Sequence, residues 1–437
     1  MTIDTSPRSR LRALFDAAVA AADPAAAVAR HLGPRPAGRV LVLAAGKGAG
    51  PMVQAVEAAW GAPLEGLAIT RHGHGVPTAL VPLVEGGHPV PDAAGAAAAA
   101  QILALAATAG VEETVLVLLS GGGSSLLAVP APGLTLAHKQ AANRALVASG
   151  APIEGINTVR KHISAIKGGR LAAACAGRLR ALVVSDVAGD DPSVISSGPS
   201  LGDPTSFADA RAVVARYQVS LPDAITAHLE RGADETPKPG DPRLARASTL
   251  VITRPRDALE AAASLARSWG LAVIDLGDAV AGEAVEVGLA HARLARTHAA
   301  SGKGPCLILS GGELTVTATG ALGQGGPAKE YALGLMLGLE GAAGIHALAG
   351  DSDGIDGSAD DAGAYVAPDS LARAQALGID IPAALARHDS RAVFAALGDL
   401  LHTGPTRTNV NDIRLILVGG VKPGRAGFPL SHAAPGP

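Results

Sequence analysis

Cysteine and aromatic residues are scarce in this sequence. Two cysteines, Cys175 and Cys306, occur in 437 residues, and aromatic residues make up 2% of the chain. Two cysteines cannot build a disulfide scaffold, or a zinc or iron–sulfur site made of cysteines. So few aromatic side chains also leave little surface on which nucleic-acid bases can stack. An apolar core must therefore hold the fold together, and a chain of this length can bury enough surface to form one.

The sequence also lacks a charge excess of one sign and a long apolar run. The net charge is −3, which gives no electrostatic reason to bind nucleic acid. The most apolar stretch, 93–110, is mostly alanine, contains Gln101 and falls short of the roughly 20 strongly apolar residues that span a bilayer. Asp16 and Asp23 interrupt the N-terminal stretch, which is typical of an amphipathic helix and not of a targeting signal. We therefore expect a cytoplasmic protein that binds neither nucleic acid nor a membrane.

Short β-branched runs alternate with alanine- and leucine-rich helical stretches along the chain. Continuous apolar runs of this kind suit parallel strands whose sheet is covered on both faces. The expected strands are 39–45, 114–119, 180–184, 248–253, 271–276, 305–309, 344–349 and 413–418. The expected helices are 51–60, 93–109, 134–148, 257–269 and 282–299. This alternation predicts an α/β fold.

One polar segment, 231–247, is rich in proline and glycine and is the best candidate for a linker. It divides the chain into an expected first domain, 1–235, and a second domain, 245–425. Both parts have the size of ordinary domains.

Glycine-rich loops follow several of the expected strands. Glycines at a strand-to-helix turn let backbone amides approach a phosphate, and a lysine there can neutralise a phosphoryl oxygen. The alternative is a tight turn that needs positive φ, with Lys47 facing solvent. The predicted phosphate-binding residues are Gly46, Ser120, Gly121, Gly122, Gly123, Ser124, Ser125, Gly311, Gly312 and Glu313.

A basic cluster and two acidic clusters accompany these loops. Residues 160–170, RKHISAIKGGR, suit an anionic ligand, although a solvated helix face would look the same. Carboxylates near phosphates usually hold Mg²⁺, which takes one or two of them together with substrate oxygens. Turn formation and helix capping are the alternatives for Asp356 and Asp360. The acidic clusters are Asp186, Asp190 and Asp191, and Asp351, Asp353 and Asp356.

Three familiar motifs are absent. The sequence has no GxxxxGK[ST], which argues against a Walker-type nucleotide site. Residues 46–51 read GKGAGP and lack GxGxxG, which argues against a standard nicotinamide site. No GxSxG elbow follows a strand, which argues against an α/β-hydrolase.

Several long motifs together resemble one known family. They are GKGAGPM at 46–52, EGGHPVPD at 85–92, LSGGGSSLL at 119–127, KHISAIKGGRLA at 161–172, SDVAGDDPSVISSGPSLGDPT at 185–205 and TGPTRTNVND at 403–412. The sequence resembles the glycerate 2-kinases of the MOFRL type, many of which are labelled hydroxypyruvate reductases. This resemblance implies a Rossmann-like N-terminal domain, a smaller C-terminal α/β domain and an active site in the cleft between them. It also implies phosphorylation of D-glycerate at its C2 hydroxyl, with ATP and Mg²⁺.

The resemblance also suggests residue roles. Lys47 matches the active-site lysine of the family, and we expect Asp186 and Asp190 to hold Mg²⁺, with Asp186 also in a catalytic role. The expected substrate-binding residues are Arg160, Lys161, Lys167, Asp353 and Arg407. Two alternatives are an NAD(P)H-dependent hydroxypyruvate reductase and a sensor that binds such ligands without turnover. Whether the protein forms a homodimer stays open.

The sequence departs from the family at one position. Many members have an arginine where residues 325–330, GGPAKE, place Pro327, and a subgroup encoded with tartrate-degradation genes looks similar to this version. Either another cation must then neutralise the transferred phosphoryl group, or the rate must fall. Lys329 is the first candidate, because on an extended segment it would point to the same side as position 327. On a helix it would face away. Arg407 is the second candidate.

Overall fold

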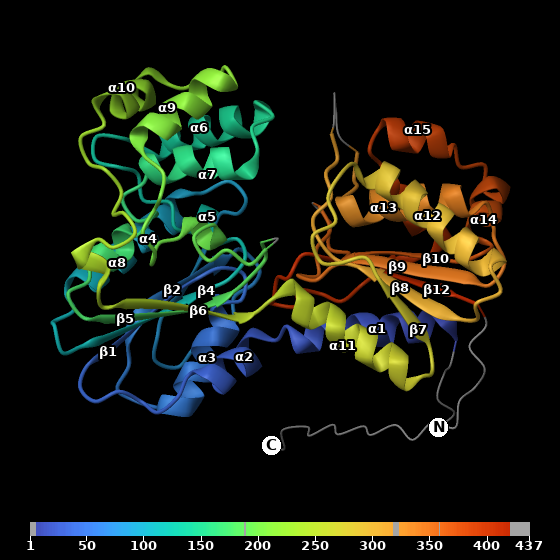
Figure 1. Ribbon diagram of the computed structural model, residues 1–437, viewed down its shortest axis with the longest axis horizontal. Helices are drawn as coiled ribbons and strands as arrows, with labels where there is room; N and C mark the ends of the chain where they lie inside the picture. Colours follow the sequence, from blue (N-terminus) through green and yellow to red (C-terminus); the bar gives the residue numbers. More distant parts are fainter. Residues whose placement is uncertain (1–5, 188, 318–322, 358, 420–437) are drawn as a thin grey trace. The chain divides into compact units, whose positions relative to one another are not determined.

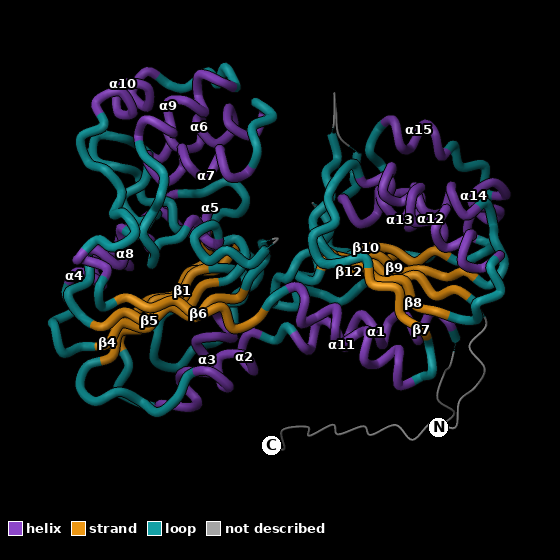
Figure 2. Tube along the Cα trace, in the orientation of Figure 1, coloured by secondary structure: helices purple, strands orange, loops and turns teal. Residues whose placement is uncertain are grey.

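The computed structural model describes residues 6–187, 189–317, 323–357 and 359–419. The chain forms two compact units, which are described separately (Figures 1 and 2). The parallel-sheet unit contains residues 22–255 and 405–411. The mixed-sheet unit contains the residues up to 21, residues 256–404 and the residues from 412 onward.

The parallel-sheet unit is built on a sheet of six strands in the order β3-β2-β1-β4-β5-β6, and every neighbouring pair is parallel. The strands are β1 (Val40–Ala45), β2 (Glu65–Arg71), β3 (Leu83–Gly86), β4 (Thr114–Leu119), β5 (Arg178–Val184) and β6 (Ala247–Thr253). This is the strand order of dinucleotide-binding Rossmann folds. The order reverses between β1 and β4, and ligands of such sheets bind beyond the carboxyl ends of the strands at that point.

Helices cover both faces of the parallel sheet (Figure 1). On one face α3 lies against β1 and β2, and α2 contacts α3, whereas α4 covers β2 and β3 from the other face. The helices of this unit are α2 (Pro24–His31), α3 (Ala49–Trp60), α4 (Ala93–Ala107), α5 (Gly123–Leu126), α6 (Leu136–Ala148), α7 (Ile153–His162), α8 (Arg170–Ala173), α9 (Phe207–Arg216) and α10 (Asp223–Arg231). All six residues of β1 are buried, which explains its unbroken apolar run.

A separate layer of helices, α6, α7, α9 and α10, has an apolar core of its own. Leu146, Val159, Phe207 and Leu229 belong to this core.

Among the described residues, no helix has both the length and the apolar character that crossing a bilayer would require.

The mixed-sheet unit contains a second sheet of six strands, in the order β11-β10-β9-β12-β8-β7. The strands are β7 (Ala272–Asp275), β8 (Cys306–Ser310), β9 (Ile345–Asp351), β10 (Gly363–Val366), β11 (Leu400–Leu401) and β12 (Asp412–Val418). β12 lies antiparallel between β8 and β9, and β10 is antiparallel to both of its neighbours. β7 and β8 are parallel.

The expectation of parallel strands is therefore correct for the first sheet and wrong for most of the second. β12 is buried along its whole length although it is antiparallel to both neighbours. Its apolar run, 413–418, reflects burial on both faces, and burial does not determine strand direction.

Helices also cover the second sheet on both faces, with α12 and α13 on one face and α1 and α11 on the other (Figure 1). The helices of this unit are α1 (Pro7–Ala21), α11 (Pro255–Ser268), α12 (Ala284–Ala300), α13 (Pro327–Leu339), α14 (Ser370–Ala376), α15 (Ile381–Ala386) and α16 (Ser390–Leu397). α12 and α13 approach closely because Gly288 and Gly334 face the partner backbone. A Cβ at Gly288 would lie 2.4 Å from the Tyr331 carbonyl oxygen, and one at Gly334 would lie 2.5 Å from that of Val285.

The division of the chain differs from the expected one. α1 contacts β9 and β12 of the mixed sheet, and the main boundary falls between Pro255 and Arg256, not in 231–247. The polar segment is instead part of the parallel-sheet unit, where Glu235 accepts a hydrogen bond from the Phe207 amide at 3.0 Å. Polar composition alone thus did not identify a linker, because these side chains bond to neighbouring segments. The expected domain end at residue 425 lies outside the described residues.

Candidate active site at the ends of the parallel strands

The loops that follow β1 and β4 interlock at the switch point of the parallel sheet. The Lys47 amide donates to the Gly121 carbonyl at 2.8 Å, and the Gly48 amide donates to Ser120 Oγ at 2.9 Å. Gly46 has φ +133°, and a Cβ there would lie 2.2 Å from Ser120 Oγ. Gly122 has φ +81°. The positive-φ turns that stood as an alternative to a phosphate cradle are therefore present, and they bring the two loops into contact.

Within the described residues, the amides of Gly121 and Gly122 donate to no protein acceptor. Free amides in a glycine loop can donate hydrogen bonds to a phosphate or another oxyanion. A loop after β5 closes over the same turn, since a Cβ at Gly123 would lie 2.2 Å from Ser196 Oγ. Ser196 and Ser197 have φ +52° and +61°, which is uncommon for residues other than glycine and concentrates at functional sites.

Lys47 is buried beside this glycine loop, with 7% of its surface exposed. A Cβ at Gly122 would lie 3.4 Å from Lys47 Cγ and 3.0 Å from His88 Nε2. Lys47 and His88 therefore border the same residue of the loop. Residue-level reasoning did not select His88, although it lies in the EGGHPVPD motif, because a lone histidine in a loop carries little signal.

Asp186 also lies against the glycine loop. Asp186 Oδ2 accepts a hydrogen bond from Asn409 Nδ2 at 3.2 Å and lies 2.5 Å from the position of a Cβ at Gly121. Asp190 Oδ2 lies 3.5 Å from Arg254 Nε, and its buried Oδ1 has no hydrogen-bond partner among the described residues. Asn409 was missed, and its only sequence signal is its place in the TGPTRTNVND motif. In the described part of the chain, no group of three or more His, Cys, Asp or Glu side chains is arranged to hold a metal.

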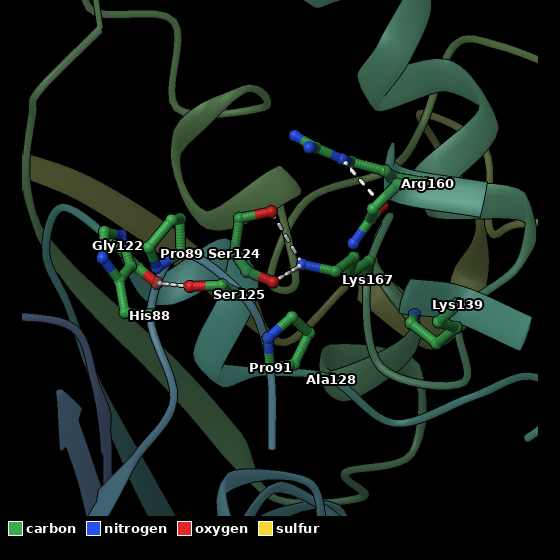
Figure 3. A pocket seen from close by; sticks show the side chains of 11 residues that line it. His88, Pro89, Pro91, Gly122, Ser124, Ser125, Ala128, Lys139, Arg160 and Lys167 are labelled. Carbon is green, nitrogen blue, oxygen red and sulfur yellow. Dashed lines mark hydrogen bonds between the residues drawn. The ribbon is translucent and has the colours of Figure 1, made fainter. Parts of the chain in front are cut away.

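A cavity of about 160 Å³ opens beside the glycine loop (Figure 3). Its cationic side chains come from three places: Lys139 on α6, Arg160 on α7, and Lys167 on the segment before α8. Lys167 Nζ donates to the carbonyl oxygen and to Oγ of Ser124, at 2.5 and 2.9 Å. The full lining is His88, Pro89, Pro91, Gly122, Ser124, Ser125, Ala128, Lys139, Asn143, Arg160 and Lys167.

These cationic groups have no carboxylate within 4.0 Å among the described residues, although Lys139 and Lys167 are only 3% and 2% exposed. Lys139 Nζ makes long hydrogen bonds of 3.4 Å to the carbonyls of Val129 and Ile163. Arg160 Nε donates to Asn143 Oδ1 at 3.1 Å. Burying charge without a counter-charge is costly, so this arrangement is typical of a site that receives an anion.

The pKa values of the cavity cations reflect the same environment. Burial, with a smaller contribution from the Arg160 charge, lowers the pKa of Lys139 to about 7. Burial also lowers the pKa of Arg160, and burial together with the Lys139 and Arg160 charges lowers the pKa of Lys167 well below its ordinary value. A bound anion would oppose each of these shifts.

Lys161 does not line this cavity with Arg160 and Lys167. Helix α7 ends at His162, so the residues 160–170 do not share one helical face. Lys161 Nζ instead lies 3.1 Å from Asp203 Oδ1, and both side chains are buried. Lys161 is thus an internal ion-pair partner. Sequence reasoning missed Lys139, which lies on another helix and belongs to no clear motif.

Lys329 is also an internal ion-pair partner. It lies on α13, which begins at Pro327, so the extended segment that would have aligned it with position 327 is not formed. Its Nζ contacts Asp361 and lies 3.1 Å from Asp356 Oδ2, and its side chain is fully buried. These contacts argue against Lys329 as the replacement cation. Asp356 also accepts from the amides of Ala328 and Lys329 at 3.1 and 2.9 Å, which is the helix-capping role considered for it.

Other predicted binding residues lie in the mixed-sheet unit, where the contacts seen for Gly311, Gly312 and Asp353 are internal hydrogen bonds. The carbonyls of Gly311 and Gly312 accept hydrogen bonds from Arg414 at 2.8 and 2.7 Å. Glu313 is exposed, and buried Asp353 accepts from the Ile355 amide at 2.8 Å. Their binding roles remain predictions.

Arg407, by contrast, belongs to the parallel-sheet unit. It has φ +60°, and its carbonyl oxygen lies 3.1 Å from the position of a Cβ at Gly48. Its Nε is buried without a hydrogen-bond partner among the described residues. Arg407 therefore lies next to the Lys47 loop and is the better placed of the two candidate cations.

A parallel sheet of Rossmann order, with glycine loops and a cationic cavity at its switch point, defines an α/β protein with a site that suits an anionic ligand. Comparison with known proteins is more specific. Residues 10–230 match a domain of unknown function, DUF4147, and residues 306–412 match the MOFRL family. The chain belongs to the MOFRL family.

Its relatives carry two kinds of name. A protein of Agrobacterium vitis, named "Putative hydroxypyruvate reductase", is 51% identical over 95% of both chains. The D-glycerate 2-kinase of Thermotoga maritima is 35% identical, over 87% of this chain and 91% of its own. A crystal structure of glycerate kinase from Thermotoga maritima matches with a TM-score of 0.81 and 33% identity, over 94% of this chain and all of that one.

Proposed function

We propose that the protein is a glycerate 2-kinase, which transfers the γ-phosphoryl group of ATP to the C2 hydroxyl of D-glycerate and releases 2-phosphoglycerate and ADP. The observation that carries the proposal is a single cavity lined by the glycine loop, through Gly122, Ser124 and Ser125, and by uncompensated cations. A kinase for a small acid needs these two features side by side. The names of the kinase relatives support the same activity.

The cavity suits a small acid better than a nucleotide. Its volume of about 160 Å³ is below the roughly 300–1,000 Å³ of sites for drug-sized ligands. Arg160 presents a planar fork that can bind a carboxylate through two hydrogen bonds, and Lys167 adds a point charge. We assign the glycerate carboxylate to these two side chains.

The glycine loops and Lys47 are assigned to the phosphates. The amides of Gly121 and Gly122 are available to phosphate oxygens, and Lys47 can neutralise charge on the migrating phosphoryl group. Phosphoryl transfer needs little covalent help from the protein, so positioning and charge neutralisation supply most of the rate enhancement.

The acidic residues at the loop fit a magnesium ion. Asp186 offers carboxylate oxygens directly against the glycine loop, and Asp190 has a buried oxygen without a hydrogen-bond partner among the described residues. Both are hard oxygen ligands of the kind that Mg²⁺ prefers. When bound, the ion would supply positive charge to the phosphate oxygens.

A hydroxypyruvate reductase is the second candidate, and the Rossmann strand order and the name of the Agrobacterium vitis relative favour it. The first loop argues against it. Residues 46–51 lack the dinucleotide fingerprint, and Ser120 Oγ fills the space beside Gly46.

The experiment supplies pure protein with ATP, Mg²⁺ and D-glycerate in one assay, and with NADH and hydroxypyruvate in another. We expect ADP formation in the first, and a product that enolase converts directly without a mutase, which identifies 2-phosphoglycerate. NADH oxidation without any ADP formation would replace the kinase proposal with the reductase. Tight ATP binding without any phosphorylated acid would instead indicate a sensor.

A further inference from the structure

The cavity beside the glycine loop contains more basic side chains than one carboxylate requires. Besides Arg160 and Lys167 it holds Lys139, whose side chain enters from α6 (Figure 3). Resting partly on the proposed function, we propose that Lys139 is a further anion-binding residue of this cavity and that it takes up a proton when the anion binds.

A purely structural role explains Lys139 poorly. Its Nζ lies 3.4 Å from the carbonyls of Val129 and Ile163, at the long limit for a hydrogen bond, and these neutral groups do not offset a buried charge. Lys161 and Lys329 show what this chain does with structural buried lysines, since each has a carboxylate at 3.1 Å. Lys139 lacks such a partner among the described residues.

The ligand class follows from the lining. The only polar side chains that share the cavity with Lys139 in the described residues are Asn143, Arg160, Lys167, His88, Ser124 and Ser125. None is a carboxylate, so the missing partner is an oxyanion from solution. Its source is either the carboxylate of the substrate acid or the phosphoryl group of the product, and the experiment separates the two.

Proton uptake follows from the charges that face Lys139. His88, Arg160 and Lys167 line the same cavity, and α7 and α10 pack against α6. Among the described residues of these elements, Arg160 is the one whose charge acts on Lys139. With burial it lowers the pKa of Lys139 to about 7, so the amine is largely neutral at pH 8. An adjacent anion favours the charged form, and the lysine therefore gains a proton on binding.

The test is calorimetric titration of the full chain at pH 8 with D-glycerate, and separately with inorganic phosphate, in two buffers of different protonation enthalpy. We expect uptake of up to about two protons per bound anion, because Lys139 and Lys167 both have lowered pKa values in the free protein and an anion raises both. Lys139→Met should weaken binding by about tenfold or more. Lys139→Arg should keep the affinity and lower the proton uptake by the share that Lys139 contributes, because arginine stays charged whereas Lys167 still takes up its proton. Lys303→Met, which alters an exposed lysine, is the matched control.

Thermal unfolding of the same variants separates a ligand role from a structural one. Lys139→Met should unfold at the same temperature as the parent or higher, because it removes a buried amine that has no counter-charge and makes only long hydrogen bonds. Stronger dependence on Lys139 for glycerate than for phosphate assigns the carboxylate, and the reverse assigns the phosphoryl group. Unchanged binding of both anions by Lys139→Met, or binding of neither by the parent protein, overturns the proposal. Anion binding that depends on Lys139 without kinase activity would refute the proposed function alone.

Discussion

Buried lysines occur in both units of the molecule, but the two that line the cavity of the parallel-sheet unit have different surroundings from the ion-paired Lys161 and Lys329. In the mixed-sheet unit, the Nζ of Lys329 lies between Asp356 and Asp361, and Arg391 Nε also donates to Asp361, at 2.6 Å. In the parallel-sheet unit, Lys139 and Lys167 are almost as deeply buried and contact only carbonyl and hydroxyl oxygens among the described residues.

This difference separates structure from function. A buried ion pair with satisfied partners is costly to break, so removal of one member should mainly affect folding. A buried cation without a counter-charge lowers stability in the free protein, and such a residue is expected where a ligand supplies the missing charge. The same residue type therefore serves two purposes, and its partners reveal which.

The largest expected effect is on folding. Lys329→Met leaves Asp356 and Asp361 without their common cation, which should lower the free energy of unfolding by about 3–5 kcal/mol. Urea denaturation followed by circular dichroism measures this change, with Lys303→Met as the control. A loss below about 1 kcal/mol, which is typical of an exposed pair, would mean that the network around Lys329 is not structural.

The next effect is on catalysis. Lys47→Met should lower kcat by about a hundredfold or more, corresponding to about 3–4 kcal/mol of lost charge stabilisation. Stability should change little, because the surrounding glycine loops offer little apolar packing to lose. Steady-state kinetics with D-glycerate and ATP, beside a thermal melt, test both statements. Near-normal turnover would remove Lys47 from the mechanism.

Lys167→Met directly tests the comparison between buried lysines with and without a carboxylate partner. We expect the KM for glycerate to rise by about tenfold, the equivalent of about 1.4 kcal/mol, because the substrate carboxylate loses one cation. Its unfolding free energy should fall far less than that of Lys329→Met. If Lys167→Met instead unfolds as readily as Lys329→Met, the hydrogen bonds of Lys167 to Ser124 are structural and the contrast between cavity lysines and ion-paired lysines fails.

A loss of similar size, but in kcat, is expected at Arg407, which lies beside Gly48. Because φ is +60° there, Arg407→Gly removes the side chain without adding backbone strain. We expect kcat to fall by about tenfold, or about 1.4 kcal/mol, if the guanidinium replaces the family arginine missing at Pro327. Arg407→Lys should restore part of the loss. An unchanged kcat in Arg407→Gly leaves Lys47 and the proposed magnesium ion as the sources of positive charge.

The sequence alone predicted the parts of this molecule that depend on local pattern. Each of the eight expected strands is present, and the glycine loops follow β1 and β4 as expected. The short strands β3, β10 and β11 were missed, because four residues or fewer carry too little periodicity. The seven-residue strand β2 was missed as well. Antiparallel pairing in the second sheet was missed because burial and not direction produces an apolar run.

Ion-pair partners were the least predictable feature. Asp203 follows Lys161 by 42 residues, and Asp361 follows Lys329 by 32 residues. Nothing in the local sequence marks either pair, so paired and unpaired lysines look alike before the fold is known. Lys139 was missed for the same reason, since its importance lies in the carboxylates that are absent from its surroundings in the described chain.

The smallest expected effect concerns pH. As the pH rises, the stability of the fold and the affinity for the anion should change in opposite directions. An unfolded lysine has a pKa near 10.4, whereas that of Lys139 in the folded protein is about 7. Between these values the unfolded chain binds more protons, so the contribution of Lys139 to stability becomes more favourable as the pH rises from about 7 toward 10. Anion binding needs the charged amine and should weaken over the same range. Denaturation and glycerate titrations at pH 6.5, 7.5 and 8.5 should therefore show opposite trends relative to Lys139→Met, in which both contributions are lost. Parallel trends would mean that Lys139 stays charged throughout, and that its cavity is already compensated before any ligand arrives.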